Sequence, residues 1–298
     1  MKVFMTGGTG FIGRNLTRIL IQNGYRVTVA TRNPDRHSTT DPELRFVPLR
    51  ENLTAEVDGS DIVINLAGET LFGKRWSRKV KKELYDSRIL TTRSLVTAMK
   101  QSKKRPVLFL SGSAVGYYGD CGNETITEER GPGRDFLART CSDWEMEAQK
   151  ASDLGIRVVN PRTGVTLGSD AVAMKFMLPV FKAFLGGSIG PGTQYFPWIH
   201  ISDLCRSMMF AIQNEAITGP FNASAPDQVT MDDFVTTLGG VLSRPAFFKV
   251  PEFGLKAVLG EASILMTASL KTEPKKISDQ GFTFVHGNLR PALQNLLH

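Results

Sequence analysis

The sequence is poor in cysteine and has no long hydrophobic run. Its 298 residues include three scattered cysteines, at positions 121, 141 and 205, whose spacing matches neither a disulfide framework nor a metal site. An odd number of unpaired cysteines is typical of a reducing compartment. No apolar run reaches the length that spans a bilayer. We therefore expect a cytoplasmic protein without a metal or membrane partner.

The chain also lacks the features of a nucleic-acid-binding protein, although its net charge is +7. Basic residues are dispersed except at 74–82 and 103–105, and no stacking platform of interleaved aromatics accompanies them. A basic cleft for anionic small molecules, or a solvated basic surface, explains the charge equally well. We therefore expect a small-molecule substrate and no nucleic acid.

The strongest motif lies at the N-terminus, where residues 2–13 read KVFMTGGTGFIG. A short apolar strand comes before the glycines, and an amphipathic helix over 14–23 follows them. The first glycines allow a tight turn that brings backbone N–H groups to a pyrophosphate, next to the positive end of the helix. A glycine-rich turn without a ligand is the alternative. The residues expected to contact a dinucleotide here are Gly7, Thr9, Gly10, Phe11, Ile12 and Gly13.

The second strand, over 25–31, indicates which dinucleotide binds. An acidic residue at its end would select NAD, whereas an arginine accommodates the 2′-phosphate of NADP. The sequence there reads Ala30-Thr31-Arg32, with no carboxylate before Asp35. We therefore expect NADP, with Thr31 and Arg32 at the phosphate. The alternative is that Arg32 is merely solvated.

The loop TGGTGFIG resembles the cofactor loop of the extended short-chain dehydrogenase/reductases, the NAD(P)-dependent epimerase/dehydratase group. FLARTCSDWE at 136–145 and PRTGVTLG at 161–168 resemble an atypical branch of that group, whose members are called epimerase family proteins and described as nucleoside-diphosphate-sugar epimerases. The resemblance implies an α/β fold, a doubly wound parallel Rossmann sheet with a smaller C-terminal α+β lobe. Residues 1–168, joined by 196–212, would form the dinucleotide-binding domain. Residues 169–195 and 213–298 would form the smaller lobe.

The resemblance also implies further cofactor contacts. A strand over 61–67 ends in small residues whose main chain would lie against the cofactor. Arg88 stands where the family has a cofactor-side asparagine, and Glu83 is a neighbour on the same helix. A helix surface of charge pairs is the alternative there. Arg162 is expected to form a structural ion pair. The additional cofactor contacts expected are Leu66, Ala67, Gly68, Glu83, Arg88 and Thr166.

The family's acid–base pair, Tyr-x-x-x-Lys, is missing. Its lysine lowers the tyrosine pKa so that the phenol can exchange a proton. Leu137 stands at the tyrosine position and Cys141 at the lysine position. Leucine cannot move a proton, and we expect Cys141 to be a small buried helix residue.

Other residues nearby offer partial substitutes for that pair. Ser113 matches the family serine that hydrogen-bonds the reacting oxygen, with Ser111 as the fallback. Tyr117 and Tyr118 are the local phenols that could supply a proton, and packing in a wall is their alternative role.

Two functions follow from these residues. One is an NADP-dependent oxidoreductase or epimerase that acts on a small polar molecule, of which nucleotide sugars are one class. The other is a catalytically silent NADP-binding sensor or scaffold, consistent with the lost Tyr-Lys pair. Many relatives pair through two long helices, so a homodimer is also an expectation.

The prediction for Arg32 can be tested by comparing the dissociation constants of NADPH and NADH. A charge-assisted hydrogen bond is worth about 1.5–3 kcal/mol, so Arg32→Ala should lower the preference for NADPH by roughly ten- to a hundredfold. An unchanged ratio would remove Arg32 from the site.

Overall fold

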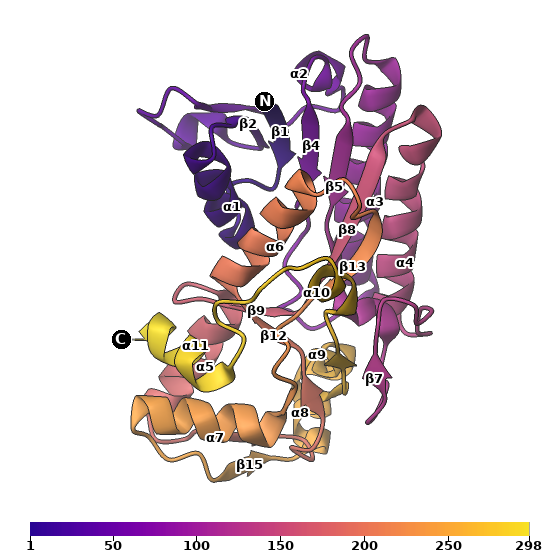
Figure 1. Ribbon diagram of the computed structural model, residues 1–298. Coiled ribbons are helices and arrows are strands. Elements are labelled where there is room, and N and C mark those ends of the chain that lie inside the picture. The colour runs from indigo at the N-terminus through magenta and orange to yellow at the C-terminus, as the bar shows by residue number, and fades with distance from the viewer. Residues whose placement is uncertain (298) are drawn as a thin grey trace.

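The computed structural model describes residues 1–297 (Figure 1). His298, the last residue of the predicted smaller lobe, lies outside the described residues. A large parallel sheet forms the centre of the molecule. Its strands are β1 (Lys2–Thr6), β2 (Arg26–Thr31), β3 (Leu44–Pro48), β4 (Ile62–Asn65), β5 (Leu108–Ser111), β6 (Ser113–Ala114), β8 (Arg157–Thr163) and β13 (Gly219–Ala223).

The order of the strands places a binding crevice beside β1. The order is β3-β2-β1-β4-β5-β8-β13, with β6 paired to β8, and every pairing is parallel. Because the chain runs outward from β1 in one direction and from β4 in the other, the order reverses between these two strands. Ligands of doubly wound sheets bind beyond the carboxyl ends at such a point. The predicted doubly wound Rossmann sheet is confirmed.

Helices cover both faces of this sheet (Figure 1). Successive side chains of β1 point to opposite faces of the sheet and pack in two different hydrophobic cores. Val3 and Met5 pack in one core with Leu204 of α6, whereas Phe4 packs in the other with Leu95 of α3. The covering helices are α1 (Phe11–Gln22) and α6 (Ile201–Gln213) on one face, and α2 (Thr54–Val57), α3 (Arg78–Gln101) and α4 (Phe136–Gln149) on the other.

The smaller α+β lobe has a core of its own. Phe181, Trp198, Phe234 and Leu293 are buried together there. Its helices are α5 (Val172–Lys182), α7 (Met231–Leu242), α8 (Glu252–Leu259), α9 (Ile264–Thr267) and α11 (Leu289–Leu297). The short helix α10 (Lys275–Asp279) lies instead against β13, and its Ile277 is buried in the core of the large sheet. Its short strands pair as β9 (Val165–Leu167) with β12 (Trp198–His200), β10 (Gly187–Ile189) with β15 (Phe248–Val250), and β11 (Tyr195–Phe196) with β14 (Val229–Thr230).

The two lobes interleave more than the predicted boundaries imply. β13 lies in the range 213–298, which we assigned to the smaller lobe, yet it pairs with β8 and extends the large sheet. β13 forms the edge strand next to β8, a position at which its Pro220, which has no backbone N–H, is tolerated. Farther along the chain, β16 (Lys271–Thr272) pairs with β7 (Thr125–Ile126).

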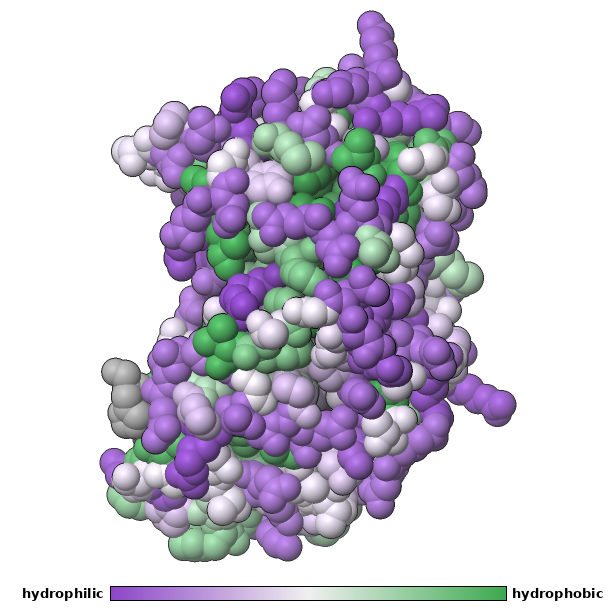
Figure 2. Space-filling view, in the orientation of Figure 1, coloured by the Kyte–Doolittle hydropathy of each residue, from purple (hydrophilic) through white to green (hydrophobic). Residues whose placement is uncertain are grey.

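The surface in Figure 2 is hydrophilic over much of this face, with hydrophobic side chains along the lower edge, where Figure 1 places β15. Phe247, Phe248 and Val250 are exposed in that segment. Within residues 1–297, none of the helices has both the length and the apolar character needed to cross a bilayer.

Asp203 fastens the C-terminal segment to α6. Its side chain is fully buried. It accepts hydrogen bonds from the backbone N–H groups of Val285 at 3.1 Å and His286 at 2.7 Å, and from Arg206 at 2.7 Å. A buried carboxylate with three donors leaves all of them unpaired if it is lost.

Asp203→Ala should therefore lower the free energy of unfolding by about 3–5 kcal/mol, the usual cost of breaking a buried charged network. Urea denaturation measures this change. Asp279→Ala is the matched control, because Asp279 forms an exposed pair with Lys275 and its loss should have little effect. Equal losses in the two variants would refute the fastening role of Asp203.

Candidate functional site

A cavity of about 440 Å³ opens beyond the carboxyl ends of β1 and β4. Its walls come from the glycine loop after β1, the segment after β4, helices α3 and α4, and the smaller lobe. Its position is the strand-order reversal described above, and its size suits a small-molecule ligand.

The glycines of the first loop are required by close contacts between backbones. A Cβ atom on Gly7 would lie 2.4 Å from the carbonyl carbon of Leu66, and Gly7 has φ of +75°. A Cβ atom on Gly13 would lie 2.2 Å from the carbonyl oxygen of Gly7. Gly10 closes the turn by donating its N–H to that same oxygen at 3.1 Å. The loop therefore presents backbone, not side chains, to the cavity.

Among the described residues, no side chain caps the first turn of α1 and no acidic residue lies within it. Gly10 is the N-cap. The free N–H groups and the helix dipole make such an end a site for phosphate. A pyrophosphate fits this uncapped end and the glycine cradle before it.

The cavity brings together most of the predicted cofactor residues. Those that line it are Gly7, Gly10, Phe11, Ile12, Gly13, Leu66, Gly68, Arg88 and Thr166. Those that do not are Thr9, Thr31, Arg32, Ala67 and Glu83. Thr31 is the last residue of β2 and Arg32 follows it.

Arg88 and Glu83 differ because a helix turns by about 100° per residue. Leu84 and Arg88, four residues apart, both line the cavity, whereas Glu83 is exposed on α3. Our expectation for Glu83 therefore differs from the structure. Arg88 donates to the carbonyl oxygens of Leu84 at 2.9 Å and Glu69 at 3.1 Å, and burial lowers the pKa of its guanidinium.

Arg32 is not free in this structure. Its Nη1 donates to Glu69 Oε1 at 3.1 Å, and the Arg32 side chain is 78% exposed. Such an exposed ion pair is worth less than about 1 kcal/mol. Glu69 itself lines the cavity, so the pair lies at the edge of the cavity.

Ser113 lines the cavity, and its side chain is held by Glu145, which does not line it. Its hydroxyl donates to Glu145 Oε1 at 2.6 Å. Arg162 donates to both oxygens of Glu145 at 2.8 Å, which confirms the predicted ion pair of Arg162. Burial alone would lower the pKa of Arg162, but Glu145 outweighs it and the pKa is raised. The fallback, Ser111, is fully buried and does not line the cavity.

The two tyrosines belong to this support and not to the cavity. Neither lines it. The Tyr118 hydroxyl is buried, donates to Asn222 Oδ1 at 2.6 Å and accepts from Arg162 at 2.9 Å. Burial raises the pKa of Tyr118 to about 12, although Arg162 opposes this shift. The guanidinium of Arg162 lies 3.5 Å from the centroid of the Tyr117 ring. Our expectation of a proton donor therefore gives way to the packing role.

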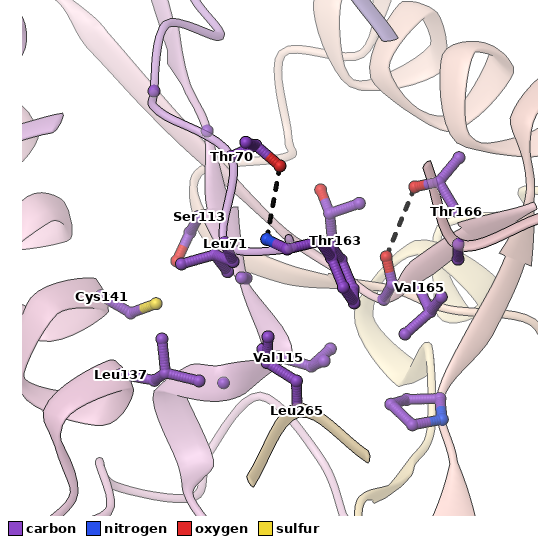
Figure 3. A pocket seen from close by; sticks show the side chains of 18 of the residues that line it. Thr70, Leu71, Ser113, Val115, Leu137, Cys141, Thr163, Val165, Thr166 and Leu265 are labelled. Carbon is purple, nitrogen blue, oxygen red and sulfur yellow. Dashed lines mark hydrogen bonds between the residues drawn. The ribbon is translucent and has the colours of Figure 1, made fainter. Parts of the chain in front are cut away.

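Leu137 and Cys141 face the cavity from α4, four residues apart (Figure 3). Burial raises the pKa of the Cys141 thiol to about 12, so the thiol is neutral at physiological pH and a poor proton carrier. The positions of the family's acid–base pair are thus occupied by one apolar side chain and one unreactive thiol.

Sequence reasoning missed three residues at or behind the cavity. Glu145 is the last residue of the FLARTCSDWE run, and it holds the Ser113 hydroxyl. Gln194 and Tyr195, from the smaller lobe, line the cavity, and no local motif marks them because only tertiary packing brings them there.

Comparison with known proteins gives two family matches. Residues 3–223 match the model of the NAD dependent epimerase/dehydratase family. Residues 250–296 match a domain of unknown function, DUF1731.

Three relatives resemble the whole chain. Epimerase family protein YfhF of Bacillus subtilis is 38% identical, over 100% of this chain and 98% of that protein. The chloroplastic SDR39U1 homolog of Arabidopsis thaliana, also an epimerase family protein, is 37% identical, over 100% of this chain and 87% of that protein. The crystal structure of human epimerase family protein SDR39U1 (isoform 2) with NADPH has a TM-score of 0.89 and 32% identity, over 99% of each chain.

The network around Tyr118 predicts a structural effect with a pH signature. Tyr118→Phe should lower the free energy of unfolding by about 1–3 kcal/mol, because Asn222 and Arg162 lose a buried partner. The folded-state pKa of about 12 exceeds the ordinary value near 10, so the wild-type tyrosine contributes stability below pH 10 that is lost as pH rises toward 12. The difference between wild type and variant should therefore shrink above pH 10.

Urea denaturation between pH 8 and pH 11 measures this effect. Tyr85→Phe is the control, since the Tyr85 hydroxyl pairs with the half-buried Asp143 and should matter less. A stability difference that is independent of pH would contradict the assigned network.

Proposed function

This chain belongs to the NAD-dependent epimerase/dehydratase family, and we propose that it is an NADP(H)-dependent oxidoreductase that acts on a small molecule in the cavity. The observation that carries the proposal is the uncapped first turn of α1 behind the Gly7–Gly13 cradle, at the wall of that cavity. When bound, the nicotinamide would take up or supply a hydride at a substrate carbon.

The preference for the phosphorylated dinucleotide is supported by the end of β2. The chain has no acidic residue between the start of β2 and Asp35, and the exposed Arg32 is held only by its weak pair with Glu69, which comes from the segment after β4. A 2′-phosphate offers a more highly charged partner in the same place. The solved human relative, whose structure holds NADPH, supports the same choice.

The protein's own contribution is to position the substrate oxygen and exclude water. Ser113 reaches the cavity at the end of a rigid series of contacts, in which Arg162 holds Glu145 and Glu145 holds the serine hydroxyl. Leu137 and Val115 supply an apolar wall beside it (Figure 3). A polar anchor in an apolar surround orients a ligand more strictly than the same group in water.

A second candidate, a catalytically silent NADP-binding sensor or scaffold, is favoured by one observation. The positions of the family's proton donor hold Leu137 and the unreactive thiol of Cys141. NADPH oxidation in the presence of a broad panel of carbonyl compounds separates the two functions. Tight NADPH binding with no oxidation across the panel would favour the sensor.

Gly10→Ala tests the cofactor site with little damage to the fold. The new Cβ atom would lie 3.3 Å from the Gly7 carbonyl oxygen, a mild crowding, and would stand where the pyrophosphate approaches the helix. We expect NADPH affinity to fall at least tenfold in a fluorescence titration, with thermal stability nearly unchanged.

Gly131→Ala is the matched control, because a Cβ atom there would meet open space. Its NADPH affinity should equal that of the wild type. Equal affinities for wild type and Gly10→Ala would place the dinucleotide elsewhere and overturn the proposed function.

A further inference from the structure

The part of the cavity beyond the glycine loop has an apolar wall. Val115, Leu137 and Leu265 surround the space below Ser113, and Leu71 and Val165 complete its sides (Figure 3). These side chains come from five separate segments of the two lobes. Burying apolar ligand surface against such a wall is favourable, whereas burying an unpaired charge there is costly.

The charged residues of the lining do not form an anion site. Among the described residues the lining holds one cation, Arg88, and two carboxylates, Glu69 and Asp135. Arg88 is engaged by two backbone carbonyl oxygens and lies over the ring of Trp144. Asp135 caps α4 by accepting from the Ala138 N–H at 2.9 Å. Among the described residues, Arg88 is therefore the one cation of the lining that a second diphosphate, in addition to that of the dinucleotide, would meet, and two carboxylates lie in the same lining.

Two basic residues at and just before the start of α3 are engaged as well. Arg75 donates to the carbonyl oxygen of Ala257, and Lys81 pairs with Glu261. Neither lines the cavity. The net charge of +7 is therefore not concentrated at this site, and a nucleoside diphosphate would gain little from it.

The polar anchor can accept a hydrogen bond from a ligand but not donate one. The carboxylate of Glu145, held at both oxygens by Arg162, is only an acceptor, so the single hydrogen of Ser113 is committed to it. The lone pairs of Ser113 Oγ remain for a ligand. A ligand hydroxyl meets this requirement.

Gln194 imposes the same requirement. Its amide nitrogen donates to the carbonyl oxygens of Ile189 at 2.7 Å and Met266 at 3.0 Å, which uses both hydrogens. Its Oε1 is buried and has no hydrogen-bond partner among the described residues. A buried acceptor without a donor costs free energy that a bound hydroxyl group or water recovers.

We propose that the cavity takes an uncharged, mostly apolar alcohol as substrate, not a nucleotide sugar. This inference rests on the proposed function, which supplies the dinucleotide as hydride acceptor. In the oxidation, the substrate hydroxyl proton passes to Ser113 Oγ while the serine proton passes to Glu145 Oε1. When bound, the oxidised dinucleotide would take up the hydride from the carbinol carbon, which would leave the substrate as the carbonyl compound.

Calorimetric titration of the full chain saturated with NADP⁺ tests the substrate class without relying on turnover. The probes are cyclohexanol, menthol and 2-phenylethanol, with UDP-glucose and cyclohexanecarboxylate as charged counterparts. We expect at least one alcohol to bind more tightly than both charged probes. Ser113→Ala should weaken that alcohol about tenfold, the effect of one lost hydrogen bond of about 1.4 kcal/mol.

A change of the apolar wall gives an independent test. Leu265→Arg should reverse the preference by weakening the alcohol and strengthening UDP-glucose, and Leu265→Met, which keeps the wall apolar, should leave both affinities near those of the wild type. NADPH affinity of each variant, measured first, shows that the cofactor half of the site is intact.

The outcomes separate this inference from the proposed function. If the wild type fails to bind NADPH, the proposed function fails. If NADPH binds but all three alcohols fail to bind, or UDP-glucose binds more tightly than each of them, the inferred substrate class is overturned while the cofactor assignment stands.

Discussion

The contact between the glycine loop and the end of β4 is the constraint on which the site depends. Gly7 touches the Leu66 carbonyl so closely that no side chain fits between them, and Gly13 lies against Gly7 in the same way. Because three backbone segments meet without side chains between them, the uncapped first turn of α1 faces the cavity at the strand-order reversal. Any larger residue would separate loop from sheet and close the space into which the helix dipole points.

A second constraint is polar and supports the part of the cavity wall that contains Ser113. Arg162 is buried, and its ion pair with Glu145 holds Ser113 in one orientation. The same guanidinium contacts Tyr117 and Tyr118, so both phenol side chains pack around this buried ion pair. Breaking such a buried pair costs about 3–5 kcal/mol. This support explains how one hydroxyl can remain fixed beside a wall in which the usual tyrosine and lysine are replaced by Leu137 and Cys141.

The residues predicted well are those whose role is set by local sequence. The glycine spacing, the strand before it and the helix after it are all local features, and the structure places Gly7, Gly10 and Gly13 together at the cavity. The ion pair of Arg162 was also anticipated. Glu83 and Tyr118 do not line the cavity, because a difference of one residue along a helix or turn exchanges the cavity side for the solvent or the core, and a motif alignment does not resolve that difference.

The sequence by itself determined the parallel sheet, the dinucleotide cradle and the loss of the Tyr-Lys pair, since each depends on residue types within a short stretch of chain. Only the tertiary structure decided the character of the substrate wall. Leu265, Gln194 and Tyr195 lie far from Ser113 in sequence, and they reach the cavity because the smaller lobe folds back over the carboxyl edge of the sheet. Burial and charge at a site between lobes are properties of that packing, and no single segment carries them.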